Sequence, residues 1–169
     1  MKQITYITPN FAVAGALEPE DISRLAELGF KSIISNRADD EQPGQLTARH
    51  EAVLAWRVGL RFRHVPATIH DLFSDEVVEA MADALQELDG PIVAHCKTGL
   101  RSAVVWAAAS ARTEDVDCVL AALSKTGFRL GHLREELEAQ AGRKRWLGSS
   151  RALDCREAAL VAGGTAAFL

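Results

Sequence analysis

A short apolar run, Pro91–His95, leads directly into Cys96, and the segment from Ser102 to Ala111 is apolar nearly all round. A helix that is hydrophobic on every side must be buried. A short apolar run bounded by a turn is typical of a buried strand. A buried strand followed at once by a buried helix indicates an α/β protein, in which helices cover both faces of a sheet.

The same alternation continues along the chain. Strands are expected at 11–15, 31–35, 62–65 and 91–95, and helices at 19–28, 46–58, 75–88, 102–111, 115–123 and 132–140. Gly29 is placed to end the first helix, and Ser74 to cap the third. The pattern predicts an α/β fold with a mostly parallel central sheet flanked by helices. We expect this domain to occupy residues 1–141, followed by a basic and then Ala-rich tail, 142–169, that is auxiliary or poorly ordered.

Composition limits the classes of partner. Hydrophobic residues make up 48% of the 169 residues and charged residues 25%, which suits one globular domain. The formal net charge of -4 does not favour a nucleic-acid partner. No stretch approaches the roughly 18 apolar residues of a membrane helix, and the N-terminus lacks the apolar run of a secretory signal. The oligomeric state is left open.

The cysteines and histidines do not form metal-ligand patterns. Cys96, Cys118 and Cys155 lie far apart with no C-x-x-C pair, which predicts neither a disulfide framework nor a structural zinc site. A reducing cytoplasm is the expected compartment. Cys118 is expected to be an inert core residue. No metal and no cofactor are expected.

The chemistry is concentrated in the segment His95-Cys96-Lys97-Thr98-Gly99-Leu100-Arg101-Ser102. Gly99 lets the backbone turn with its N–H groups inward, and the following helix N-terminus carries partial positive charge. These features predict an anion-binding loop that holds Cys96 as a nucleophilic thiolate. Arg101 can add a forked, charged donor, and Ser102 can donate its hydroxyl to the sulfur. The simpler alternative is a buried, inert cysteine beside a surface arginine.

The other loop residues have more modest expected roles. Lys97 is placed at the pocket mouth, where it adds positive charge, whereas Thr98 shapes the loop and Leu100 completes it. His95 either orders the loop or is a histidine packed at the end of a strand. Arg37, in the polar loop 36–45, is expected to pair with nearby acids.

The loop resembles the signature of cysteine-dependent protein tyrosine and dual-specificity phosphatases. Phe11–Gly15, the helix after Pro19 and the segment Gly29–Arg37 resemble the opening of a small dual-specificity-type phosphatase. From about residue 3 to 140 the chain resembles the phosphatase-like domain of bacterial beta-lactamase-hydrolase-like proteins. In that family the domain occurs alone or fused to a persulfide dioxygenase of the metallo-β-lactamase fold. The resemblance implies a cysteine-phosphatase-like fold and a hydrolase that acts through a Cys96 thiophosphate.

One departure from the phosphatase signature keeps a second activity open. The signature is C-x5-R, but here the spacing from Cys96 to Arg101 is C-x4-R, and Ser102 stands where the arginine would be. The shorter spacing resembles rhodanese sulfurtransferases, whose smaller loop suits a persulfide sulfur. A phosphoryl group needs room for three equatorial oxygens.

The alternatives differ in the groups that they require. A phosphatase needs a general acid, and the resemblance makes Asp71 the best-placed candidate, although this residue could simply cap a turn. A sulfurtransferase would carry a Cys96 persulfide from a sulfane-sulfur donor to a thiol acceptor without such an acid. A third possibility is a non-catalytic module that binds anions or phosphopeptides. The expected partner is thus an anionic small molecule or phosphorylated substrate, or the donor and acceptor pair.

Overall fold

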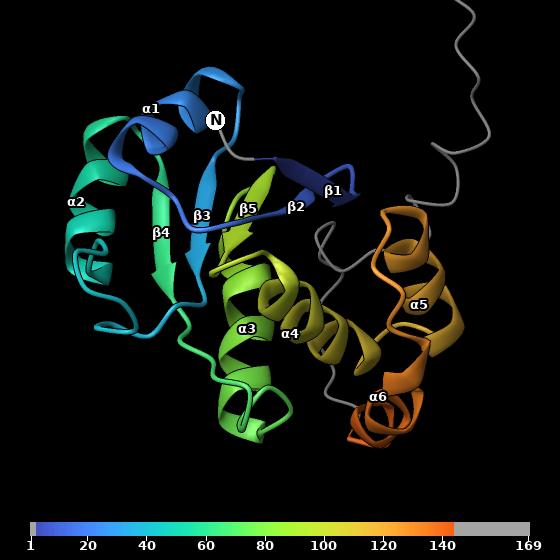
Figure 1. Ribbon diagram of the computed structural model, residues 1–169. Coiled ribbons are helices and arrows are strands. Elements are labelled where there is room, and N and C mark those ends of the chain that lie inside the picture. The colour runs from blue at the N-terminus through green and yellow to red at the C-terminus, as the bar shows by residue number, and fades with distance from the viewer. Residues whose placement is uncertain (1–2, 144–169) are drawn as a thin grey trace, which may run out of the picture.

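The computed structural model describes residues 3–143, so residues 144–169 of the expected tail lie outside the described part of the chain. Within it, a five-stranded sheet has the order β1-β2-β5-β3-β4 (Figure 1). The strands are β1 (Ile4–Thr8), β2 (Phe11–Ala14), β3 (Ser32–Ser35), β4 (Arg61–His64) and β5 (Ile92–His95). β1 pairs antiparallel at one edge, and every other pair is parallel. The expected α/β fold with a mostly parallel sheet is confirmed.

Helices cover both faces of the sheet. In the described residues they are α1 (Pro19–Glu27), α2 (Ala48–Arg57), α3 (Asp75–Glu87), α4 (Leu100–Ala111), α5 (Val116–Lys125) and α6 (Arg134–Ala141), with a 3-10 turn at Gly131–Leu133. α1 and α2 pack on one face, and α3 and α4 on the other, with α5 and α6 against α4. None of these helices is long and apolar enough to cross a membrane.

Side chains of the central strands alternate between two hydrophobic cores. Ala12, Ala14 and Val93 face the core beneath α1 and α2, whereas Phe11 and Val13 face the core beneath α3 and α4. The alternation follows from the two-residue period of a strand. β5 is buried on both faces, which explains why its sequence is a continuous apolar run.

The sequence interpretation differs from the structure in two ways. It missed β1, although Ile4–Thr8 consists entirely of β-branched and aromatic residues, which favour strands. It began the buried helix at Ser102, whereas α4 begins at Leu100 because Gly99 caps it. Cys118 is partly buried against the core, which agrees with its expected position.

Backbone hydrogen bonds bring the carboxyl ends of the parallel strands together. The Asn36 N–H donates to the His95 carbonyl over 2.8 Å, and the Ala67 N–H donates to the Asn36 carbonyl over 3.2 Å. The Cys96 N–H donates to the Ala14 carbonyl over 3.4 Å. The loops after β2, β3, β4 and β5 therefore meet at one edge of the sheet, which is where α/β proteins form their ligand sites.

Candidate active site

The loop after β5 folds back on the sulfur of Cys96. Cys96 is buried, and the Gly99 N–H donates to its Sγ over 3.1 Å. Gly99 has a φ of 91°, a left-handed conformation that strains other residues. A Cβ at this position would also lie 3.3 Å from the Ala14 carbonyl oxygen. Glycine is therefore required both for the turn and for the close approach to β2, and the first turn of α4 begins beside the sulfur.

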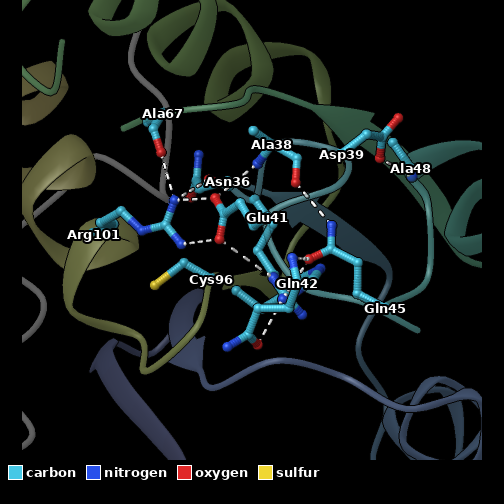
Figure 2. Close-up of polar contacts among 12 residues, drawn as sticks. Asn36, Ala38, Asp39, Glu41, Gln42, Gln45, Ala48, Ala67, Cys96 and Arg101 are labelled. Carbon is cyan, nitrogen blue, oxygen red and sulfur yellow. Dashed lines mark hydrogen bonds and ion pairs between the residues drawn. The ribbon is translucent and has the colours of Figure 1, made fainter. Parts of the chain in front are cut away.

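Arg101, in the first turn of α4, reaches across to the loops after β3 and β4. Its Nη1 donates to Glu41 Oε1 over 2.5 Å and to the Ala67 carbonyl over 2.6 Å, and its Nη2 donates to Glu41 Oε2 over 2.7 Å (Figure 2). The bonds to Glu41 are the main cause that raises the pKa of Arg101, and the charge of Cys96 raises it further. The guanidinium is thus held where the loops after β3 and β4 meet the start of α4.

Ser102, at the position where the C-x5-R signature has its arginine, has a different role from the one expected. Its side chain is buried, and its Oγ has no hydrogen-bond partner among residues 3–143. The expected bond from this hydroxyl to the sulfur is not formed, and the Gly99 N–H takes its place. The same part of the chain contains no group of three or more His, Cys, Asp or Glu side chains arranged for a metal ion.

Thr98 and Lys97, the two loop residues that follow Cys96, are both exposed. Thr98 Oγ1 accepts the Leu100 N–H over 3.5 Å, which shapes the loop. Lys97 is exposed at the mouth, and its carbonyl accepts the Ala16 N–H over 3.3 Å. The loop is thereby attached to the segment after β2.

Glu41 is a site residue that the sequence interpretation missed. It lies between β3 and α2, and its Oε1 also accepts the Ala38 N–H over 3.0 Å. Hydrogen bonding from Arg101 lowers the pKa of Glu41, so the carboxylate is charged at neutral pH. The sequence shows that this loop is polar, but no local pattern indicates which acid meets an arginine 60 residues later.

Arg37 pairs with a nearby acid, as expected, and is also buried at 7% exposure. Its Nε lies 3.8 Å from Glu41 Oε2. Its Nη2 donates to Gln45 Oε1 over 2.6 Å and to Gln42 Oε1 over 3.2 Å. Arg37 and Lys97 both line a cavity of about 320 Å³ that adjoins the loop.

His95 is both packed and hydrogen-bonded. It is fully buried at the end of β5, and its Nε2 lies 3.1 Å from Oε2 of Glu51 on α2. Glu51 is itself only 2% exposed and is the second site residue that the sequence interpretation missed. His95 Nδ1 has no hydrogen-bond partner within the described residues. The two interpretations of His95 therefore combine: it fills the strand end and connects the loop to a buried carboxylate.

Asp71 lies in a turn that borders the site. Its Oδ1 accepts the Thr68 N–H over 2.6 Å, and its carbonyl accepts the Ser74 N–H over 2.9 Å. Ala67, which precedes this turn, is the residue whose carbonyl binds Arg101. The Asp71 carboxylate caps the turn, as the simpler interpretation held, and its role as a general acid stays a hypothesis.

Comparison with known sequences agrees with the loop resemblance. A family described as "Beta-lactamase hydrolase-like protein, phosphatase-like domain" matches residues 3–113. A beta-lactamase hydrolase-like protein of Xylella fastidiosa is 28% identical over 144 residues, covering 82% of this chain and 32% of that protein. One from Agrobacterium fabrum is 31% identical over 100 residues, covering 59% and 23%. The chain thus spans about a third or less of the length of these relatives.

Solved structures show the same fold. A candidate phosphatase from Neisseria meningitidis is 27% identical with a TM-score of 0.69, covering 81% of this chain and 97% of that one. Kinase-associated phosphatase, solved with serine in place of its catalytic-site cysteine, is 16% identical with a TM-score of 0.60, covering 83% and 96%. The expected cysteine-phosphatase-like fold is confirmed. The relatives named here give no support to the sulfurtransferase alternative.

Proposed function

Because the chain belongs to the family of phosphatase-like domains of beta-lactamase hydrolase-like proteins, we propose that it hydrolyses phosphate monoesters through Cys96. One observation carries the proposal: the Gly99 N–H donates to the Cys96 sulfur, and the Arg101 guanidinium, from the helix that this loop starts, is held by Glu41 and the Ala67 carbonyl where the neighbouring loops meet. Donors in these positions can bind the oxygens of a phosphoryl group that approaches the sulfur.

The reaction has two displacements at phosphorus. In the first, the Cys96 thiolate attacks, the bond from phosphorus to the ester oxygen breaks, and the departing oxygen takes a proton. A thiophosphate on Cys96 results. In the second, water attacks phosphorus, the sulfur leaves as a thiolate, and inorganic phosphate is released. Arg101 and the backbone N–H groups of the loop stabilise the negative charge on the equatorial oxygens in both steps.

Asp71 is the candidate for the group that protonates the departing oxygen. Its turn follows Ala67, whose carbonyl binds Arg101, so the carboxyl group lies on a segment that borders the site. Asp71→Asn should lower kcat for an alkyl phosphate about 100-fold, but kcat for p-nitrophenyl phosphate much less, because nitrophenolate leaves without a proton. Equal losses with both substrates would argue against the assignment.

Loop length alone favours a second candidate, sulfur transfer. A persulfide sulfur on Cys96 needs less room than a phosphoryl group, and four residues separate Cys96 from Arg101. In this reaction the thiolate attacks the outer sulfur of a sulfane-sulfur donor and releases the donor's leaving group. A thiol acceptor then attacks the outer sulfur of the persulfide, and the Cys96 thiolate leaves.

Two assays on the purified protein test these functions side by side. One measures phosphate release from p-nitrophenyl phosphate, and the other measures thiocyanate formed from thiosulfate and cyanide. Cys96→Ser is the control in both. Phosphate release that disappears in Cys96→Ser supports the proposal. Activity in the second assay alone would overturn it in favour of sulfur transfer, and activity in neither would favour a non-catalytic anion-binding module.

A further inference from the structure

We propose that the cavity beside the Cys96 loop is a second anion-binding subsite, and that the substrate therefore carries two phosphate groups. This inference rests on the proposed function, because it identifies a class of substrate for the same site. One phosphate would be attacked by Cys96, and the other would bind in the cavity next to Lys97.

The first argument is the charge around the cavity. Arg37 and Lys97 both line it. Glu18 lines it too, and its side chain is held in the capping box at the start of α1. The cavity walls therefore carry two cations and one carboxylate, an excess of positive charge in a chain whose formal net charge is -4.

The second argument is the incomplete pairing of Arg37. Glu41 forms two hydrogen bonds with Arg101, of 2.5 and 2.7 Å, whereas its nearest approach to Arg37 is 3.8 Å. Two arginines thus share the one negative charge of this carboxylate. The Nε of Arg37 is buried and has no hydrogen-bond partner among the described residues. A buried charged group costs free energy, and the negative charge of an anion in the cavity would stabilise the guanidinium.

The third argument is the position of the cavity relative to the nucleophile. Lys97 directly follows Cys96 and also lines the cavity, so the two subsites share a residue. Gln42 and Gln45 hold the Nη2 of Arg37 and line the same cavity. The cavity therefore adjoins the Cys96 loop, and the proposal places one phosphate of a single small molecule in each subsite.

The test measures binding, which does not depend on turnover. Calorimetry on Cys96→Ser compares alkanediol bisphosphates of increasing chain length with the matching monophosphates. We expect one chain length to bind at least about tenfold more tightly than its monophosphate. If no bisphosphate in the series binds more tightly than its monophosphate, the second subsite is overturned while the proposed function stands. If neither class of compound binds, both are overturned.

A charge variant separates a true subsite from general attraction between the extra phosphate and the protein. Gln42→Glu, in the Cys96→Ser background, places a carboxylate beside Arg37 at an exposed position, so buried packing is preserved. The bisphosphate should then bind only about twofold more tightly than the monophosphate, or less, while the affinity for the monophosphate changes little. The matched control is Gln86→Glu, the same change at an exposed position on α3. An undiminished advantage in Gln42→Glu, or an equal loss in Gln86→Glu, overturns the proposal.

Discussion

Arg101 and Glu41 lie 60 residues apart in the sequence and meet through two hydrogen bonds between the guanidinium and the carboxylate. A two-point contact of this kind fixes the plane of the guanidinium as well as its position. Arg101 comes from the start of α4, and Glu41 comes from the loop after β3. Glu41 is therefore a positioning residue, which fixes the orientation of Arg101 at the edge of the sheet where Cys96 lies.

Glu41→Gln should weaken catalysis through Arg101. We expect kcat/KM for p-nitrophenyl phosphate to fall about tenfold in Glu41→Gln and about 100-fold or more in Arg101→Lys. Because both changes act on one guanidinium, the double variant should be little worse than Arg101→Lys alone. Steady-state kinetics on the three variants checks this, and fully additive losses would show that Glu41 acts independently of Arg101.

The pH dependence of stability should also report on Glu41. Hydrogen bonding to Arg101 lowers the Glu41 pKa in the folded protein below its usual value of 4.5. The stabilisation is therefore fully present above the unfolded-state pKa and is lost as the pH falls through the lower folded-state pKa. The difference in free energy of unfolding between the parent and Glu41→Gln should shrink below pH 4.5. Urea unfolding at a series of pH values measures it, and a difference that grows on acidification would have the wrong sign.

Gly99→Ala should damage both stability and activity. The alanine would adopt a φ of 91° and place its Cβ 3.3 Å from the Ala14 carbonyl. Backbone strain alone should cost about 1–2 kcal/mol, and relief of the contact should shift the loop around Cys96. Gly59→Ala is the matched control, because Gly59 has a φ of 79° with nothing within 4 Å. We expect comparable strain in both variants, with phosphate release lost only in Gly99→Ala.

The buried pair between His95 and Glu51 should be costly to break. Glu51→Ala leaves a buried imidazole nitrogen without its acceptor, so we expect a loss of about 2–4 kcal/mol in the free energy of unfolding. Glu76→Ala, at an exposed position in the first turn of α3, should cost less than about 1 kcal/mol. Because His95 precedes Cys96, alkylation of the sulfur by iodoacetamide should also slow several-fold in Glu51→Ala. Unchanged alkylation with reduced stability would mean that the pair is structural only.

The parts of the site that could be predicted from the sequence are contiguous in it. Cys96, Gly99 and Arg101 belong to one strand, loop and helix, whose order and burial are visible in the hydrophobic pattern. Glu41 and Glu51 could not be predicted, because their partners depend on the register of β3 beside β5 and on how α2 packs. The orientation of the Arg101 side chain could not be predicted for the same reason. The spacing from Cys96 to Arg101 is visible in the sequence, but the side chain is held by residues from two other loops.

The nucleophile is anchored where the molecule should open last. β5 and the part of α4 from Ser102 onward are buried on all sides, so their amide hydrogens should exchange with solvent only on global unfolding. The loop at 36–47, which holds Glu41, is mostly polar and more exposed, and it can fluctuate at lower cost. The position of Cys96 therefore depends on a region of high local stability, whereas the orientation of Arg101 depends on a region of lower local stability. Substitutions in the polar loop can change the reactivity of the site while the scaffold around Cys96 keeps its resistance to unfolding.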